Sequence, residues 1–375
     1  MSDRKIESPT GKQEKEKFSE LSRRNFLKAS ATAIGVGLAS PALGATSEDL
    51  ASGYPMEGAD HEINSCCQFC QVRCTTKVQV KNGRVVNVYG NPENFWTGGA
   101  MCPKGKSMVE LTYSPHRILH PLVREGDTWK KISYEQALAL VAEKILDLKK
   151  NNPEDYAHRL AMFEPCFESR ESELAAKMAL NMAGFPDLCS PGDVCIGNTS
   201  TTLGICLGSA ISPTNLKEVL NAETLVIIGA NIAEIYPPYM RWLLKAREKG
   251  VKIIYLDPRR TPTANFCDTH IMPRPGTDGA LVLGIIRLLI EENLYDKEYV
   301  DSHVNGFEKL VEGAMAYTPE KVEEITWIPA EKVVDLARTL GRSSRTIAWI
   351  GGSISRYTNA IQTVRTIIGL QAMKG

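Results

Sequence analysis

The sequence predicts an α/β protein in which a small cysteine-rich module precedes a doubly wound parallel sheet. From Thr224 onward, short buried strand patterns alternate with amphipathic helical patterns across short loops. This alternation is typical of parallel strands joined by helical crossovers. Five of the ten cysteines lie between Cys66 and Cys102, ahead of the alternating region. A chain of 375 residues is long enough for two or three domains with separate cores.

Individual elements follow from local patterns along the chain. Two alternating segments flank Lys81-Asn82-Gly83, and an Asn-Gly pair between alternating segments predicts a β-hairpin. Apolar runs that end in glycine or charged loops predict the buried strands, and apolar residues at helical spacing predict the helices. The expected strands are Thr75–Val80, Arg84–Tyr89, Thr224–Ile228, Val251–Leu256, His270–Met272 and Thr346–Ile350. The expected helices are Ser133–Leu148, Tyr239–Lys249, Gly279–Asn293 and one or two between Pro319 and Leu340.

The first 45 residues differ in composition from the rest of the chain. A polar head leads to Arg23 and Arg24, Phe26-Leu27-Lys28 follows, and a weakly apolar stretch then runs to Ala45. That stretch is interrupted by glycine and proline and is too short for a membrane span, which needs about 20 apolar residues. The pattern predicts a twin-arginine signal peptide over residues 1–45 and a polar linker over residues 46–60. The alternative is an amphipathic helix with a chance arginine pair.

The charge balance excludes one class of function. Lys and Arg together number 44, as do Asp and Glu, so the formal charge is zero. No basic tract follows the first 30 residues, and nucleic-acid binding needs a clustered positive field. We therefore expect no nucleic-acid partner. Together with the signal peptide, the composition predicts a neutral enzyme exported by the twin-arginine translocase to the periplasm or to the outer face of the cytoplasmic membrane.

Four cysteines have the spacing of metal ligands. The pattern is Cys67-x2-Cys70-x3-Cys74, followed after 27 residues by Cys102-Pro103-Lys104-Gly105. Four thiolates can hold a [4Fe–4S] cluster or a tetrahedral zinc ion, and the spacing favours the cluster, because zinc sites more often use two short cysteine pairs. Disulfides are a weaker third interpretation. Cys66 leaves an alternative register open, since Cys66-x3-Cys70 also fits.

This cysteine set, followed by Pro-Lys-Gly, resembles the N-terminal cluster domain of the molybdopterin oxidoreductases. The resemblance selects Cys67 over Cys66 as a cluster ligand. It implies that Lys104 lies between the cluster and a pterin and helps electrons to pass between them. The alternative for Lys104 is an ordinary solvated surface lysine. The match is continuous from about His61 to Gly375.

The resemblance also divides the chain into domains. It implies a [4Fe–4S] domain over residues 61–115, a first α/β molybdopterin domain over residues 116–192 and 345–375, and a Rossmann-like pterin-binding domain over residues 193–344. Family members continue into a C-terminal β-barrel domain, which the resemblance implies is missing. We therefore expect this chain alone to bind the cofactor poorly and to show little turnover.

Three short segments are suited to bind a nucleotide-like ligand. Two follow expected strands, at residues 229–231 and 257–261, and one opens an expected helix, at residues 275–278. Glycines let a backbone approach phosphate closely, acids accept ribose or guanine donors, and helix N-termini favour anions. The alternatives are an ordinary turn at the strand ends and a helix N-cap at Thr277 or Asp278. Together these segments resemble the family's binding site for one guanosine-linked pterin. The cofactor implied is molybdenum or tungsten bis(molybdopterin guanine dinucleotide). The expected binding residues are Gly229, Asn231, Asp257, Arg259, Gly276, Thr277, Asp278 and Gly351.

The expected metal ligand from the protein is Cys195. Members of the family supply one side chain on a glycine-rich loop before the first nucleotide-binding strand, and here that loop runs from Cys189 to Gly197. Cys189 is the alternative ligand, whereas Cys206 is expected in the core. Formate dehydrogenases of the family place a histidine directly after the ligand, and Ile196 stands there in this chain. The loop therefore looks more like that of polysulfide, thiosulfate or tetrathionate reductases, with arsenate or formate as alternatives.

The resemblance implies partners as well as cofactors. These are a ferredoxin-like iron–sulfur electron-transfer subunit, a membrane quinone-linked anchor subunit and a small inorganic substrate. Three interpretations from other functional classes are alternatives to a redox enzyme. The chain could be a cluster-carrying electron-transfer subunit without an active metal, a protein with a structural zinc, or a hydratase on the same scaffold.

Overall fold

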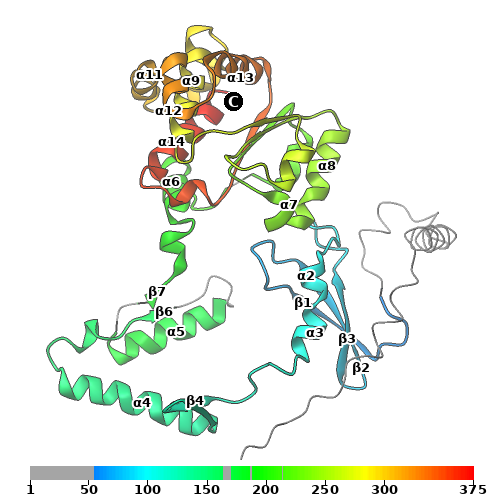
Figure 1. Cartoon of the computed structure of the whole chain (residues 1–375), viewed down its shortest axis with the longest axis vertical. Coiled ribbons are helices and arrows are strands. Elements are labelled where there is room, and N and C mark those ends of the chain that lie inside the picture. The colour runs from blue at the N-terminus through cyan, green and yellow to red at the C-terminus, as the bar shows by residue number, and fades with distance from the viewer. Residues whose placement is uncertain (1–54, 164–169, 186–187, 213) are drawn as a thin grey trace, which may run out of the picture.

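The computed structural model describes residues 55–163, 170–185, 188–212 and 214–375. The predicted signal peptide and most of the predicted linker lie outside these residues. Figure 1 shows three parts in space. The cysteine module lies beside the α7 and α8 end of a larger sheet domain, and an arm that carries α4 and α5 extends away from both.

The cysteine module is built on a three-stranded antiparallel sheet in the order β1-β2-β3. The β2–β3 hairpin turns at Asn82 and Gly83, which both have positive φ, at 50° and 72°. An Asn-Gly pair tolerates this conformation, so the hairpin predicted from the sequence is confirmed. The strands are β1 His61–Cys66, β2 Thr75–Lys81 and β3 Arg84–Gly90, and the helices are α2 Pro103–Lys106 and α3 Met108–Thr112.

A four-stranded parallel sheet forms the centre of the larger domain. Its order is β10-β9-β8-β11, so the chain winds outward from β8 through β9 to β10 and then returns to the other side of β8. The predicted parallel sheet is thus confirmed, with His270–Met272 displaced by one residue. The strands are β8 Thr224–Ile228, β9 Lys252–Leu256, β10 Thr269–Ile271 and β11 Thr346–Ile350.

Helices cover both faces of this sheet, as a doubly wound fold requires. Side chains alternate along a strand, so Val226 and Ile228 of β8 face one apolar core, whereas Leu225 and Ile227 face the other. The first core includes α9 Asp278–Glu291, α13 Ala330–Arg342 and α14 Ala360–Ala372, and the second includes α8 Met240–Glu248. The other helices are α6 Gly197–Leu207, α7 Ile232–Ile235, α10 Lys297–His303, α11 Phe307–Met315 and α12 Pro319–Thr326.

The arm contains the helix predicted over Ser133–Leu148. Ser133 caps this helix: its hydroxyl accepts from the Gln136 backbone while the Gln136 side chain accepts from the Ser133 backbone. Leu138, Val141 and Leu146 leave its apolar stripe exposed. No helix in the described part of the chain is long and apolar enough to cross a membrane. The elements are β4 Leu122–Glu125, β5 Thr128–Lys131, α4 Tyr134–Asn151, β6 Met162–Phe163, α5 Arg170–Ala183 and β7 Leu188–Cys189.

The last segment of the chain joins the large sheet. The family resemblance implies that residues 345–375 belong to one domain with residues 116–192. In the structure, β11 pairs with β8 of the large sheet along its whole length. The helix α14 that follows packs in the core with α9. The reason lies in the β11 sequence, whose apolar residues Ile347 and Ile350 meet opposite cores of the sheet domain.

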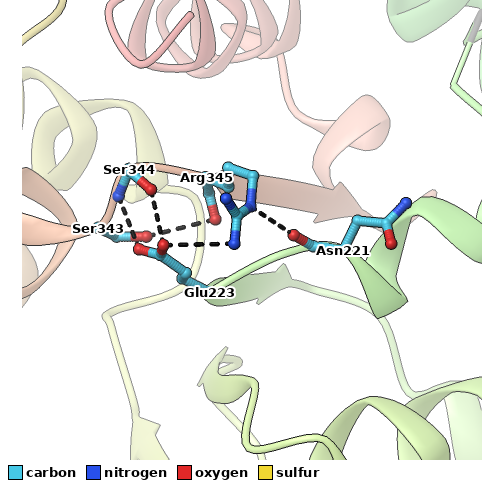
Figure 2. A network of polar contacts seen from close by, with 5 residues as sticks. All are labelled: Asn221, Glu223, Ser343, Ser344 and Arg345. Atoms are coloured by element: carbon cyan, nitrogen blue, oxygen red, sulfur yellow. Dashed lines mark hydrogen bonds and ion pairs between the residues drawn. The ribbon is translucent and has the colours of Figure 1, made fainter.

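A polar network fixes the entry to the paired strands β8 and β11 (Figure 2). The Glu223 carboxylate accepts hydrogen bonds from the Ser344 backbone and hydroxyl, at 2.9 and 2.7 Å, and lies 3.4 Å from the Arg345 guanidinium. Arg345 also donates to the Asn221 carbonyl at 2.8 Å. These bonds, led by the Ser344 hydroxyl, hold the pKa of Glu223 below its usual range. They set the register in which β11 joins β8.

Helix α8 docks the cysteine module onto the sheet domain. The Trp242 indole donates to the Trp96 carbonyl at 2.6 Å. The neighbouring Arg241 guanidinium donates to the Thr97 carbonyl and, at 2.8 Å, to the Gly98 carbonyl. Arg241 is half-buried, and burial lowers its pKa. A charged donor therefore satisfies backbone carbonyls of the loop that precedes Cys102.

We expect Arg241→Ala to weaken this docking. The variant removes charged hydrogen bonds to two part-buried carbonyls, which costs about 2 kcal/mol of the free energy of unfolding. Glu248→Ala, on the exposed side of the same helix, is the matched control. Denaturant unfolding of the two variants measures the difference. Equal midpoints for both would show that Arg241 contributes nothing to the docking.

Candidate active site

Three of the predicted cluster cysteines, Cys67, Cys70 and Cys74, pack in one small core of the cysteine module, and Cys102 lies within electrostatic reach of Cys67 and Cys74. Cys67 and Cys74 are only 4% and 3% exposed, and the Cys67 backbone N–H donates to the Cys74 carbonyl at 2.8 Å. Burial, followed by the nearby thiols of Cys67, Cys70 and Cys102, raises the pKa of Cys74 to about 12. Thiols this crowded and buried become thiolates only when a cation compensates their charge. The donor set therefore fits a multi-iron cluster.

Cys66 occupies a different environment from that of its neighbour. It closes strand β1, where it pairs with Thr75, and its half-buried sulfur accepts from the Gln68 amide at 3.4 Å. Cys67 instead belongs to the buried core that also contains Cys74. Among the described residues, no three His, Cys, Asp or Glu side chains are arranged to hold a single metal ion. The choice of Cys67 over Cys66 stays a prediction.

A cavity of about 690 Å³ opens where the carboxyl ends of the parallel strands face the cysteine module. It lies at the point where the strand order reverses between β8 and β11, which is the usual ligand site of such sheets. Thr277 and Gly351 are not in its lining, although Gly276 and Gly352 are. The predicted site residues that line it are Cys70, Lys104, Cys195, Gly229, Asn231, Asp257, Arg259, Gly276 and Asp278.

Glycine backbones form part of the cavity floor. Gly229 has a φ of 61°, and a Cβ there would collide with the Ser353 hydroxyl, which donates to the Gly229 carbonyl at 2.7 Å. Gly351 lies directly against Gly229, so a Cβ at Gly351 would fall on the Gly229 carbonyl and 2.8 Å from the Ala230 Cα. A Cβ at Gly276 would lie 3.2 Å from the Tyr357 ring. This backbone cradle fits a flat, phosphate-bearing ligand.

Polar side chains at the strand ends are held in fixed orientations. The Asp257 carboxylate accepts from the Tyr255 hydroxyl and from the Arg259 backbone, both at 2.8 Å. The Asn231 carbonyl oxygen accepts from the Thr263 hydroxyl at 2.9 Å, and its amide donates to Glu234. Asp257 and Asn231 are each 7% exposed and still line the cavity. Such fixed acceptors and donors suit the sugar and base of a nucleotide.

The start of helix α9 forms the opposite rim. Thr277 occupies the N-cap position, but its hydroxyl donates to the Arg274 carbonyl at 2.6 Å instead of capping the helix. Asp278 is buried at the first helical position, and burial raises the pKa of its carboxyl. The side-chain cap weighed from the sequence is therefore absent at Thr277. The Ala280 N–H already donates to the Thr277 carbonyl at 3.0 Å, so the N–H groups that a ligand at this rim would meet lie ahead of Ala280.

Cys195 lies at the end of the cavity nearest to the turn after β11. Its sulfur is 3.7 Å from an Arg356 guanidinium nitrogen. The loop is tied to that turn by Ser355, whose hydroxyl accepts from the Thr199 backbone at 3.0 Å. Cys189 is exposed and does not line the cavity. Cys206 is exposed as well, so its expected place in the core is wrong, because the whole last turn of α6, residues 204–207, is exposed.

Residues of the cysteine module and of the segment after β8 make the cluster-side wall of the cavity, which is defined here as Phe69, Cys70, Gln71, Lys104 and Tyr236. The Lys104 ammonium donates to the Glu234 carbonyl at 3.4 Å, so the predicted intermediary bridges the two domains. The Tyr236 hydroxyl donates to the Gln71 side chain at 3.3 Å.

Sequence reasoning missed Arg356 and Tyr236. Neither lies in a recognised motif, and each reaches the cavity only because distant segments meet there. The available signal is their position, since Arg356 follows Gly351-Gly352 at the end of one strand and Tyr236 follows Gly229-Ala230-Asn231 at the end of another. Side chains shortly after such strand ends generally face the ligand site of a parallel sheet.

The arrangement defines a class of protein. Four clustered thiols next to a glycine-lined, nucleotide-type cavity that contains a further thiol are typical of redox proteins that pair an iron–sulfur cluster with a nucleotide-bearing metal cofactor.

Comparison with known proteins gives the family. Residues 117–375 match the family model described as molybdopterin oxidoreductase, and residues 60–114 match the molybdopterin oxidoreductase Fe4S4 domain. The chain belongs to the molybdopterin oxidoreductase family, as its sequence predicts. Its cofactors are a [4Fe–4S] cluster and a molybdenum or tungsten pterin.

Curated relatives and a solved structure agree with this placement. The chain is 29% identical to the F420-dependent formate dehydrogenase subunit alpha of Methanocaldococcus jannaschii, over 84% of this chain and 46% of the relative. It is also 29% identical to the thiosulfate reductase molybdopterin-containing subunit PhsA of Salmonella typhimurium, over 85% and 41%. Acetylene hydratase from Pelobacter acetylenicus matches with a TM-score of 0.73 and 30% identity, over 83% and 43%. The chain spans less than half the length of these proteins.

Proposed function

We propose that this chain is the cluster- and pterin-binding part of an exported catalytic subunit that reduces an inorganic sulfur compound. The substrate class is thiosulfate, tetrathionate or polysulfide, and Cys195 is the protein's ligand to molybdenum or tungsten. One observation carries the proposal: a single cavity is lined by the cluster ligand Cys70, by Lys104 and by Cys195. Electrons from the cluster therefore have a short route to the place where the metal would be held.

The cofactor, when bound, supplies a metal that accepts and releases two electrons at a sulfur-rich centre. The chain's own residues would hold and orient this cofactor. Gly229, Asp257 and the start of α9 would bind its nucleotide end, and Cys195 would bind its metal end. Arg356, beside Cys195, places a permanent positive charge where an anionic substrate would arrive. For thiosulfate, two electrons and one proton break the S–S bond and release sulfite and hydrosulfide.

The position after Cys195 favours this chemistry over formate oxidation. Ile196 lines the cavity directly beside Cys195 and has no group that can take a proton. Formate oxidation releases a proton, and a base beside the metal would be needed to accept it. Formate stays the second candidate, because a formate dehydrogenase subunit is among the relatives.

Viologen-linked assays on the full-length enzyme, purified without oxygen, test the substrate. Oxidation of reduced viologen by thiosulfate, tetrathionate or polysulfide supports the proposal. Arsenate as the sole oxidant would move the assignment to arsenate reduction. Formate-driven dye reduction without turnover of a sulfur compound would contradict the proposed sulfur chemistry. Hydration of an alkyne without any dye reaction would instead indicate a hydratase, the activity named for the solved structure.

We expect Cys195→Ala to lower turnover of the sulfur substrate by at least about 100-fold, an effect of roughly 2.7 kcal/mol on the activation barrier. The reason is the loss of the metal's side-chain ligand, while the cluster thiols are untouched. Cys189→Ala is the matched control, since Cys189 is exposed on the same loop and outside the cavity. The metal's EPR signal should change only in the Cys195 variant. A collapse of turnover in Cys189→Ala alone would reassign the ligand.

We further propose export by the twin-arginine translocase, on the strength of Arg23 and Arg24, with the folded enzyme acting in the periplasm or at the outer face of the cytoplasmic membrane. A ferredoxin-like iron–sulfur subunit would deliver electrons to the cluster, and a membrane quinone-linked subunit would anchor the complex. Replacement of both arginines by lysine, followed by cell fractionation, tests the export route. Unchanged periplasmic enzyme would contradict it.

A further inference from the structure

We propose that Tyr236 is a positioning residue that seals the iron–sulfur cluster from the active-site cavity and thereby sets the reduction potential of the cluster. The inference rests on the cluster ligands assigned above and does not depend on the substrate. It concerns the cluster-side wall, where Tyr236 packs against the core of the cluster cysteines and also lines the cavity.

Tyr236 is placed where the cysteine module and the sheet domain meet. Together with Tyr239 it packs against the buried core of Cys67, Val72 and Cys74, and both tyrosines also pack against the α8-side core of the sheet. The two rings are 5.8 Å apart. Tyr236 therefore belongs to the packing around the cluster as well as to the lining of the cavity.

Tyr236 lines the same cavity as Cys70 and Cys195. Burial, followed by the nearby sulfurs of Cys70 and Cys195, raises the pKa of the Tyr236 phenol. A single half-buried side chain is thus within electrostatic reach of the cluster ligand and of the candidate ligand to the second metal. The hydrogen bond from its hydroxyl to Gln71, the residue after Cys70, fixes the ring in this place.

The cavity side is one route by which water reaches the cluster; Cys102, half-buried as well, lies outside the cavity lining. Cys67 and Cys74 are almost fully buried, whereas Cys70 is half-buried and lines the cavity. The potential of an iron–sulfur cluster depends on solvent exposure and on the surroundings of its sulfurs. Reduction adds a negative charge to a cluster that four thiolates already make anionic, so water stabilises the reduced form more. An apolar ring over Cys70 therefore lowers the potential.

The test uses the full-length holoenzyme and an EPR-monitored redox titration of the cluster. We expect Tyr236→Ala to favour the reduced cluster by about tenfold, a positive shift of roughly 59 mV for a one-electron couple. Coupling of exchangeable deuterons to the cluster in D2O should increase in the same variant, because more water reaches Cys70.

Two further variants separate the seal from general effects. Tyr236→Phe keeps the ring and should retain the wild-type potential and deuteron coupling. Tyr357→Ala opens the same cavity from the Gly276 side, away from the cluster cysteines, and should also leave the potential unchanged. An equal shift in Tyr357→Ala, an equal shift in Tyr236→Phe, or no shift in Tyr236→Ala would each overturn the inference.

The outcomes also separate this inference from the proposed function. Loss of the cluster signal in Tyr236→Ala would leave Tyr236→Phe and Tyr236→Leu as the deciding variants, both expected to keep the seal. If these two retain the cluster but shift its potential, the inference fails. The proposed function fails independently, through the substrate assays, whatever the potential of the cluster.

Discussion

Cys67→Ser is expected to strip most of the iron from the protein, whereas Cys66→Ser leaves the cluster in place. Cys67 lies in the buried core with Cys74, within electrostatic reach of Cys70 and Cys102. Cys66 closes a strand and is bonded to the Gln68 amide. Because a cubic cluster needs four thiolates, removal of the buried one leaves an iron without its ligand. Iron and sulfide content and the EPR signal of the reduced cluster measure both variants.

The same pair of variants decides between the two registers that spacing leaves open. An intact cluster in Cys67→Ser together with a lost cluster in Cys66→Ser would establish the Cys66-x3-Cys70 register. Zinc in place of iron in the wild-type protein would contradict the cluster altogether. Both variants change one sulfur to oxygen on neighbouring residues, and circular dichroism of each variant separates loss of the cluster from loss of the fold, since Cys67 is the more buried of the two.

Gly351→Ala is expected to destabilise the protein by about 3 kcal/mol and to empty the pterin site, because a methyl group there has no room. Its Cβ would fall on the Gly229 carbonyl and within 2.8 Å of the Ala230 Cα, and Gly229 lines the cavity. Neither is the end of a flexible side chain, so the carboxyl ends of β8 and β11 must separate. Thermal unfolding and the pterin content of the purified full-length enzyme are the measurements.

Gly352→Ala is the matched control for this prediction. A Cβ at Gly352 meets only the Ile196 side chain, at an ordinary contact distance of 3.6 Å. We expect normal stability and normal pterin content in this variant. Equal behaviour of the two alanine variants would show that the close approach of Gly351 to Gly229 has no part in holding the cofactor.

Much of the fold was predictable from local patterns. The strand Thr224–Ile228 and the hairpin at Asn82-Gly83 were found where the sequence placed them, because a five-residue apolar run and an Asn-Gly turn each have one favoured structure. The placement of residues 345–375 was less accessible. The strand β11 joins β8 through pairing across more than a hundred intervening residues, and no local pattern specifies such a partner.

The candidate site divides in the same way. Residue spacing predicted the four cluster cysteines and the cofactor-binding segments at Gly229, Asp257 and Gly276, because ligand chemistry and turn geometry depend on neighbouring residues. Spacing left Arg356 and Tyr236 out, because their roles come from what lies across the cavity. Thr277 was chosen for its place in a motif, yet its hydroxyl is turned to the Arg274 carbonyl and away from the cavity.

The sequence by itself determined the family and the cofactors of this protein, and it predicted the ligand residues, since these depend on residue types at fixed local spacing. Only the tertiary structure decided which of these residues meet. The cluster-side wall and the Cys195–Arg356 pair are made by segments that the parallel sheet brings to one edge. Long-range pairing and burial create these contacts, and they are properties of the folded chain rather than of any segment within it.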